Sequence, residues 1–397
     1  MEQCPIALPF DRPGPFDPPR ALAGLREQAP MTPLSFVDGH VGWLATGYEA
    51  ARTVLADPRF SARRELMHVP LDLGFAHEIA GGPPEAGEFL RMDPPEHTRY
   101  RRLLIAQFTA RRLKQLEPRI AEVTQTCLDR MEAAGSPVDL VREFALPVPS
   151  RVICELFGVP YARLEEFQNH LGTMVDTDAP GEEAMEAYTA FLEFLAGLIA
   201  DKRKAPGEDF FSGLVDSGEL SDEELTNIGF ILFGAGFETT ANMLGLGTFA
   251  LLSHPDQLAL LRGDPSLIDG AVEELLRHLT IIHFGPLRAA LEDVEVEGAL
   301  VRKGQVVVVS LPAANRDPKR FTDPERLDIT GSAQGHLTFG YGPHQCLGQQ
   351  LARIEMRIAF PALLERFPTL RLACAPEDVP TKDMMIVHGV KKLPVAW

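Results

Sequence analysis

The stretch "FGYGPHQCLG" (residues 339–348) places a cysteine near the end of a glycine-rich loop, directly before the helix-like run "QQLARIEMR" (349–357). Unpaired backbone N–H groups and the helix dipole at a helix start both stabilise negative charge. We therefore expect Cys346 to tend toward the thiolate. A thiolate acts as a nucleophile or as a metal ligand.

Cys346 is open to three interpretations. As a nucleophile it would need a neighbouring base, and His344, two residues away in the same loop, is poorly placed to meet it. As a metal ligand it has no second cysteine nearby, which excludes an iron–sulfur cluster and structural zinc and leaves a single axial thiolate on a heme iron. A buried, inert cysteine is the usual fate of a lone Cys, but the glycine-rich loop makes that interpretation weaker here.

The segment 222–253, "DEELTNIGFILFGAGFETTANMLGLGTFALLS", predicts one long buried helix. Ser221 and Glu224 form a capping box at its start. The helix would be roughly 48 Å long, and apolar residues surround it almost completely, which is typical of a buried helix. A membrane span is the alternative, but a charged residue such as Glu238 at the centre of a bilayer costs about 3 kcal/mol.

Two polar side chains, Glu238 and Thr239, lie in the middle of this helix, where burial is costly unless they are paired or hydrated. Gly234 and Gly236 remove side chains one turn earlier. A groove beside these glycines would let a small polar ligand approach the backbone and receive protons from the hydroxyl and the carboxylate. A helix-packing glycine beside a capped polar kink is the simpler interpretation, and this segment alone favours it.

Composition excludes several functional classes. The chain has 397 residues, a net charge of −18 and 45% hydrophobic residues, so it can bury a sizeable core but lacks the basic face that nucleic acid requires. Its five cysteines include no C-x-x-C pair, which argues against structural zinc and a disulfide framework. The first twenty residues resemble neither a signal peptide nor a membrane anchor. We expect a cytoplasmic protein that binds neither nucleic acid nor a membrane.

The remaining sequence predicts a mainly α protein with small β-sheets. Strand-like stretches lie near 32–46, 294–301 and 305–311. Helices are expected at 47–56, 96–107, 111–134, 140–157, 160–176, 181–203, 222–253, 267–279 and 347–366.

Taken together, the motifs resemble the cytochrome P-450 monooxygenase family. "FGYGPHQCLG" is similar to its heme-binding signature, in which Phe339, Gly340 and Gly348 accompany the iron ligand Cys346. "AGFETT" (235–240) resembles the oxygen-activation motif on the family's long central helix. The resemblance implies a P-450 fold in which the heme lies between that helix and the cysteine loop.

A buried charge network is implied by the same resemblance. "EELLR" (273–277) contains Glu274 and Arg277, which match the family's Glu-x-x-Arg pair, and Arg326 in "DPERLD" matches the third member. We interpret the three residues as structural, since they would fix the loop that presents the cysteine.

The implied cofactor is heme b, whose two carboxylates need local cations in so acidic a protein. The matching positions are His97 and Arg101 in "HTRYR", Arg288 in "FGPLRAALED" and His344 in the cysteine loop. Arginine offers bidentate, charge-assisted hydrogen bonds to carboxylates.

The implied reaction inserts one atom of O2 into a hydrophobic small molecule, by hydroxylation or epoxidation. Glu238 and Thr239 would be the catalytic residues that relay protons. The chain is expected to be a single domain over 1–397, β-richer near its N-terminus and without a reductase domain, and to act as a monomer. Electrons would therefore come from a ferredoxin and its reductase. The resemblance implies that the ferredoxin docks on the basic stretch 99–119. The simpler interpretation of this stretch is a helix face exposed to solvent.

The sequence style resembles actinobacterial members of the family, which often oxidise antibiotics such as macrolides and other polyketides. Phe237 stands where many bacterial members carry histidine, and we expect it to reshape the pocket near the oxygen. Gly331 stands where an arginine is frequent. The pocket is expected to be lined by 62–92, 163–200, 231–240, 281–285 and 384–388.

Two alternative functions remain at this point. A heme-thiolate protein could bind a ligand or gas without turnover, but such a protein needs no proton relay. A peroxide-driven hydroxylase is the other alternative, and relatives of that type usually lack the acid–alcohol pair.

Overall fold

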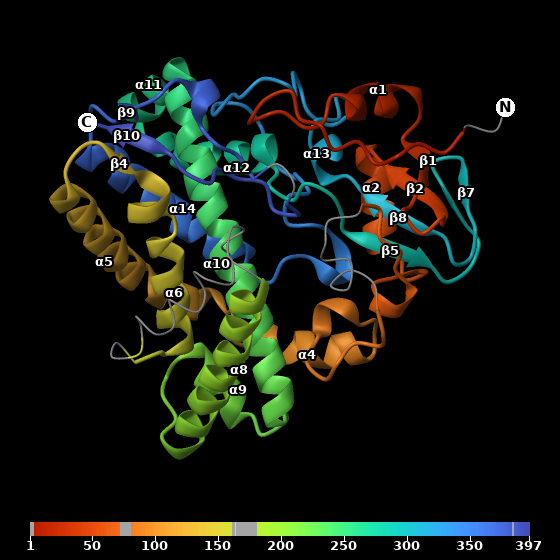
Figure 1. Ribbon diagram of the computed structural model, residues 1–397, viewed down its shortest axis with the longest axis horizontal. Helices are drawn as coiled ribbons and strands as arrows, with labels where there is room; N and C mark the ends of the chain where they lie inside the picture. Colours follow the sequence, from red (N-terminus) through yellow and green to blue (C-terminus); the bar gives the residue numbers. More distant parts are fainter. Residues whose placement is uncertain (1–3, 72–80, 161–162, 164–180, 383–384) are drawn as a thin grey trace.

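The computed structural model describes residues 4–71, 81–160, 163, 181–382 and 385–397. It is mainly α-helical with small sheets, as predicted (Figure 1). Helix α10 (Asp222–Ser253) crosses the middle of the molecule, with a helical layer on one side and a five-stranded sheet on the other. The other helices are α1 (Ala21–Gln28), α2 (Tyr48–Ala56), α4 (Glu96–Ile105), α5 (Ala110–Ala134), α6 (Pro147–Phe157), α8 (Gly181–Lys204), α9 (Phe210–Asp216), α11 (Pro255–Gly263), α12 (Ile268–Leu279), α13 (Leu311–Ala314) and α14 (Gln349–Arg366).

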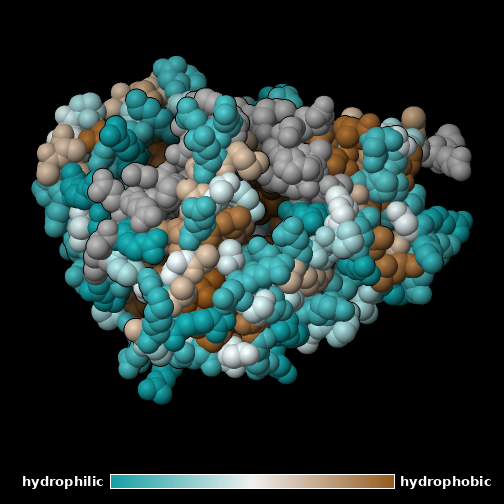
Figure 2. All heavy atoms as spheres, turned by 60° about the horizontal axis from the view of Figure 1, so that its bottom comes forward, coloured by the Kyte–Doolittle hydropathy of each residue, from teal (hydrophilic) through white to brown (hydrophobic). Residues whose placement is uncertain are grey.

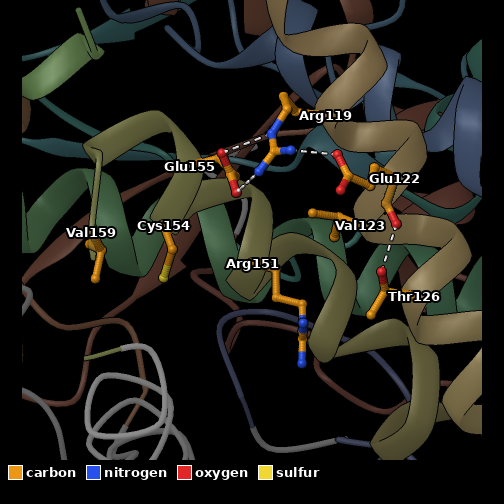
Figure 3. Close-up of a pocket in the computed structure, with 8 residues that line it drawn as sticks. All are labelled: Arg119, Glu122, Val123, Thr126, Arg151, Cys154, Glu155 and Val159. Carbon is orange, nitrogen blue, oxygen red and sulfur yellow. Dashed lines mark hydrogen bonds and ion pairs between the residues drawn. The ribbon is translucent and has the colours of Figure 1, made fainter. Parts of the chain in front are cut away.

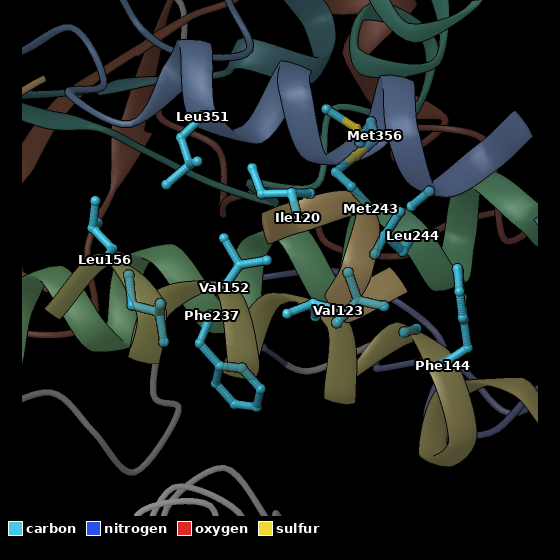
Figure 4. Packing of buried hydrophobic residues seen from close by; sticks show 14 of the residues in the cluster. Ile120, Val123, Phe144, Val152, Leu156, Phe237, Met243, Leu244, Leu351 and Met356 are labelled. Carbon is cyan, nitrogen blue, oxygen red and sulfur yellow. The ribbon is translucent and has the colours of Figure 1, made fainter. Parts of the chain in front are cut away.

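Helix α10 begins and ends where the sequence predicts. Ser221 Oγ accepts from the N–H of Glu224 at 3.2 Å, and the Glu224 carboxylate accepts from the N–H of Ser221 at 2.7 Å, so the capping box is confirmed. The helix packs against α6, α8 and α14. Figure 4 shows the hydrophobic cluster between these helices, to which Met243 and Leu244 of α10 contribute. This packing fixes α10 relative to the helix that follows the cysteine loop.

The main sheet has the strand order β1-β2-β8-β5-β3. Strand β8 pairs in parallel with β2 and antiparallel with β5, and all four of its valines are buried because one hydrophobic cluster lies on each face of the sheet. The strands are β1 (Met31–Ser35), β2 (Val41–Ala45), β3 (Phe60–Ser61), β5 (Leu287–Ala290) and β8 (Val306–Val309); smaller sheets contain β6 (Val294–Val296) with β7 (Ala299–Val301), and β4 (Val138–Asp139), β10 (Pro394–Ala396) and β9 (Arg371–Leu372).

The predicted elements agree with the structure except at a few points. The helix expected over 140–157 is divided into a π-helical turn at Val141–Ala145 and α6, because Pro147 has no N–H to continue the first ladder. The elements that were not predicted are helices α1, α9, α11 and α13 and strands β3, β4, β5, β9 and β10. The helix expected at 160–176 lies almost entirely outside the described residues.

No helix among the described residues has the length and apolar character needed to span a bilayer. The face drawn in Figure 2 is mostly hydrophilic, with hydrophobic residues in scattered positions. The membrane interpretation of 222–253 is therefore not supported.

Glu355, on the inner face of α14, is a buried carboxyl group outside the predicted site. The residue is 2% exposed, its Oε2 has no hydrogen-bond partner, and burial raises its pKa well above the usual value. The pKa of Glu355 is therefore higher in the folded state than in the unfolded state, where it is near 4.5. Because the unfolded state releases this proton first, the free energy of unfolding falls as pH rises above 4.5.

We therefore expect Glu355→Gln to stabilise the protein at pH 8 and to have little effect at pH 4.5, because the amide removes the titrating group while keeping its shape. Urea midpoints at the two pH values measure this. Glu365→Gln, an exposed position on the same helix, is the control. An equal effect of Glu355→Gln at both pH values would contradict the prediction.

Candidate functional site

The cysteine loop is built from glycines in conformations that other residues rarely adopt. Gly340 and Gly342 have φ of 70° and 75°. A Cβ at Gly342 would lie 2.6 Å from the carbonyl oxygen of Leu55 at the end of α2, so no side chain fits there. The N–H of Cys346 donates to the carbonyl of Phe339 at 2.8 Å, which folds the loop back on itself. The loop therefore presents Cys346 in one fixed position.

The sulfur of Cys346 lies at the start of α14. Backbone N–H groups of Gly348 and Gln349 hydrogen bond to it, and Arg101 and Arg353 add positive charge nearby. Part of the residue is exposed, but desolvation by the surrounding protein is the largest influence and raises the pKa of the thiol. The N–H groups at the helix start and the two cations lower the pKa of Cys346, as predicted, but desolvation outweighs them, so the expectation that the free cysteine tends toward the thiolate is wrong. A bound metal cation would displace the proton.

The four predicted cofactor-binding side chains come together beside this loop. His97 and Arg101 lie on α4, Arg288 on β5, and His344 in a 3₁₀ turn at Gly342–His344. The rings of His97 and His344 are 4.0 Å apart, and the Arg101 guanidinium donates to the carbonyl of Gln345. Three distant segments thus meet, as the resemblance implies.

Among the described residues, these basic groups form no ion pair, although the charge of Asp93 acts on His97 and Arg288. Within the described residues, neither Arg101 nor Arg288 forms an ion pair with a carboxylate, and Arg288 donates only to the adjacent carbonyl of Leu287 at 2.8 Å. Burial lowers the pKa of Arg288 to about 10, and burial with the nearby cations lowers that of His344 to about 2. His97 Nε2 and His344 Nδ1 are buried and have no hydrogen-bond partner in the part of the chain that the structure describes. A group with two carboxylates satisfies this set, so the residues present fit heme.

Replacing Arg288 tests this fit. We expect Arg288→Met to lower the heme content at least about fivefold, since a desolvated charge-assisted pair is lost. The unfolding midpoint of the heme-free protein should stay the same or rise, because an unpaired buried cation is removed. Soret absorbance relative to total protein measures heme content, and Arg302→Met, an exposed strand-end arginine, is the control. Full heme content in Arg288→Met would contradict the assignment.

The two predicted catalytic residues lie on an open face of α10. Gly234 and Ala235 are exposed, and Glu238 and Thr239 are partly exposed on the same face one turn later. Thr239 Oγ1 donates to the carbonyl of Ala235 at 2.6 Å, and a carboxylate oxygen of Glu238 lies 3.5 Å from Lys382 Nζ. Glu238 and Thr239 are adjacent in the sequence, and each side chain is held by a different partner.

The opposite face of the same turn is packed. A Cβ on Gly236 would lie 3.0 Å from Ile153 Cδ1 of α6, so Gly236 is a helix-packing glycine, whereas a Cβ on Gly234 would meet nothing within 4 Å. Phe237 is 4% exposed and belongs to the hydrophobic cluster in Figure 4. The expectation that Phe237 shapes the pocket near oxygen is therefore wrong, because its ring lies in the core.

One network beneath the cysteine loop was missed by the sequence reasoning. Arg353 lies 4.5 Å over the ring of Phe339 and pairs with Glu273 at 2.6 Å, and His336 Nε2 lies 3.1 Å from the same carboxylate. Burial alone would raise the pKa of Glu273, but the hydrogen bonds from His336 and Arg353 outweigh it and lower the pKa to about 2. The position of Glu273 beside Glu274 was the available signal.

The predicted charge network is confirmed in part. Arg277 pairs with Glu274 at 2.7 Å, with both side chains 4% exposed. Arg326 is exposed, and only its carbonyl oxygen accepts from Arg277, at 3.3 Å. The assignment of its guanidinium to the network is therefore wrong. The nearby buried cation is instead Arg316, which pairs with Glu325 at 2.7 Å.

A pocket between α5 and α6 lies apart from this site (Figure 3). Its wall includes Arg119, which pairs with Glu122 and, at 2.9 Å, with Glu155. None of the predicted catalytic or cofactor-binding residues lines it.

Comparisons with known proteins show the family and the fold of this chain. A sequence model of the family described as cytochrome P-450 matches residues 182–394. The chain is 49% identical to cytochrome P-450 105C1 of a Streptomyces species, covering all of both chains. It is 44% identical to pentalenic acid synthase of Streptomyces avermitilis, covering 99% and 98% of the two chains. The crystal structure of CYP105P1 in complex with filipin I superposes with a TM-score of 0.91, at 44% identity over 99% of each chain.

Proposed function

Because this chain belongs to the cytochrome P-450 family of heme-dependent monooxygenases, we propose that it hydroxylates or epoxidises a hydrophobic natural product, with electrons supplied by a ferredoxin and its reductase. One oxygen atom of O2 would enter the substrate, and the other would leave as water with two protons and two electrons. When bound, heme supplies the oxygen activation, which a thiolate ligand favours.

The observation that carries this proposal is the convergence, on the loop of Cys346, of four basic side chains that form no ion pair with a carboxylate among the described residues. Arg101, Arg288, His97 and His344 would hold the two carboxylates, and Cys346 Sγ would be the iron ligand. The loop itself is rigid, since Gly342 abuts the end of α2 and the network of Glu273 and Arg353 supports it from below. This arrangement fixes where the ligand sulfur lies relative to the carboxylate-binding groups.

The open face of α10 supports a catalytic function over simple ligand binding. Thr239 Oγ1 can donate its own proton to a bound reactant and accept another from the Glu238 carboxyl group. The Glu238 side chain is 24% exposed, so it can exchange protons with water. A protein that only binds a gas or ligand has no use for such a pair.

The natural-product substrate class is supported by the relatives. One is named pentalenic acid synthase, and another was crystallised with filipin I. Partly buried hydrophobic side chains near the site, Ile282 and Val387, belong to stretches expected to line the pocket. These features favour a hydrophobic small molecule.

Only some of the cations in the basic stretch 99–119 are available to bind an electron donor. Arg99, Arg102 and Arg119 pair with carboxylates of this chain, and Arg101 contacts the cysteine loop. The remaining cations of the basic stretch are Arg111, Arg112 and Lys114, at the start of α5. We assign ferredoxin docking to this group, where charge complementarity would steer association.

Turnover with and without reducing partners tests the proposal. We expect product from NADH, a ferredoxin and its reductase with substrates that shift the Soret band, and little product from hydrogen peroxide alone. Thr239→Ala should lower product formed per NADH at least about tenfold, because a positioned proton donor is lost. Thr226→Ala, which removes a similar hydroxyl-to-carbonyl bond at the surface end of α10, is the control. Equal turnover with peroxide and no effect of Thr239→Ala would favour a peroxide-driven hydroxylase instead.

A further inference from the structure

The carboxylate of Glu238 is held by a cation from a distant segment. Lys382 Nζ lies 3.5 Å from its Oε1, and the two side chains are 13% and 24% exposed. We infer that Lys382 is a positioning residue that acts through Glu238 to keep the proton relay aligned with Thr239. This inference rests on the proposed function, and it names a residue that the family motifs in the sequence do not include.

Lys382 lies near the C-terminus in a hairpin whose described residues are 381–382 and 385–390. Thr381 and Val390 form an antiparallel bridge, and the N–H of Lys382 donates to the carbonyl of Gly389 at 2.8 Å. On its other side the hairpin pairs with 281–283, where Ile282 and Val387 form a second bridge. The backbone of Lys382 is therefore fixed by hydrogen bonds, independently of its side chain.

The hairpin is pressed against α10. A Cβ at Gly389 would lie 2.1 Å from Asn242 Oδ1, and a Cβ at Gly245 would lie 3.1 Å from Val390 Cγ2. Asn242 in turn donates to the carbonyl of Glu238 at 2.9 Å. Backbone and small-residue contacts thus hold the hairpin against the helix turn that carries the carboxylate, and loss of the lysine charge should leave this packing intact.

The ion pair between Lys382 and Glu238 is partly shielded from solvent. An exposed pair contributes little because water and salt screen it, but the low exposure of Lys382 reduces that screening. Thr239 donates to the carbonyl of Ala235 rather than to the carboxylate, so the threonine does not hold Glu238 in place. In a relay, a proton passes from water to the Glu238 carboxylate and then to Thr239 Oγ1, which releases its own. That transfer needs the carboxylate at a fixed position, which Lys382 provides.

The hairpin also connects this position to the expected substrate pocket. Val387 pairs with Ile282, and both belong to stretches expected to line the pocket. A substrate that contacts the hairpin at Val387 would therefore also affect the position of the Lys382 ammonium group, which orients Glu238.

The test uses the heme-loaded enzyme and two independent readouts. The first is the rate at which acetic acid N-hydroxysuccinimide ester modifies Lys382, followed by mass spectrometry. We expect that rate to rise at least about threefold in Glu238→Gln, because the amine loses its ionic partner. Modification of Lys391, an exposed lysine next to the hairpin, should not change. An unchanged rate at Lys382 would overturn the inference, whatever the activity.

The second readout is product formed per NADH with 7-ethoxycoumarin as the probe. We expect Lys382→Met to lower it at least about fivefold, Lys382→Arg to restore most of it, and Lys391→Met to leave it unchanged. In a Glu238→Gln background, Lys382→Met should have no additional effect, because it acts through the carboxylate. An equal loss in both backgrounds would overturn the positioning function. Absence of product from the wild type with every substrate would instead contradict the proposed function, while the labelling readout would still decide on the pair.

Discussion

Cys346→Ser is expected to lower product formation at least about 1,000-fold, which corresponds to roughly 4 kcal/mol of lost transition-state stabilisation. Serine fits the space of the thiol, and the loop is shaped by Gly340, Gly342 and the bond from the Cys346 N–H to Phe339, so the fold should persist. What is lost is the anionic sulfur ligand, which favours O–O cleavage.

Three measurements check this result. Product assays give the loss of activity, circular dichroism shows whether the fold is kept, and the carbon monoxide spectrum of the reduced protein should move away from the position typical of thiolate ligation. Cys374→Ser is the matched control, since this partly exposed free cysteine lies away from the site. A Cys346→Ser variant with an unchanged spectrum would show that another group binds the iron.

The second large effect is expected at the buried pair of Glu274 and Arg277. Arg277→Met should lower the free energy of unfolding by about 3–5 kcal/mol, because the Glu274 carboxylate would remain buried without its cation. The guanidinium also donates to the carbonyls of Asn315 and Pro324, both at 2.9 Å, so the loop between α13 and the cysteine segment would lose its anchor. Heme content should fall as a consequence.

Arg326→Met is the informative comparison for this prediction. Its guanidinium is exposed, and its contribution to the network is a carbonyl oxygen that methionine also supplies. We expect its urea midpoint to stay close to that of the wild type. Equal destabilisation by the two substitutions would mean that the arginine side chain at 326 does enter the network, as the motif suggested.

Local signals predicted the helices best. Helix α10 begins and ends where the sequence predicts, because the capping box at its start and the proline after its end depend only on residues within one helical turn. Strand β5 was missed, although it carries Arg288, because its four residues (Leu287–Ala290) include no β-branched or aromatic side chain, whereas β8 consists of four valines.

Motif matching predicted which residues gather at the site but not how each side chain is oriented. His97, Arg101, Arg288 and His344 do meet, whereas Arg326 faces solvent, since a motif fixes a position in the chain and not a side-chain rotamer. The raised pKa of Cys346 could not be predicted either, because the desolvation comes from segments distant in sequence.

The close approach of Gly342 to Leu55 has a consequence for truncation and circular permutation. The carbonyl at the end of α2 forms part of the surface on which the cysteine loop closes, although the two segments come from opposite ends of the chain. A shortened protein without its first sixty residues would leave the iron-binding loop without that surface. We therefore expect the N-terminal part to be required for cofactor retention, so that it would have to be supplied in trans to any fragment built around the C-terminal signature.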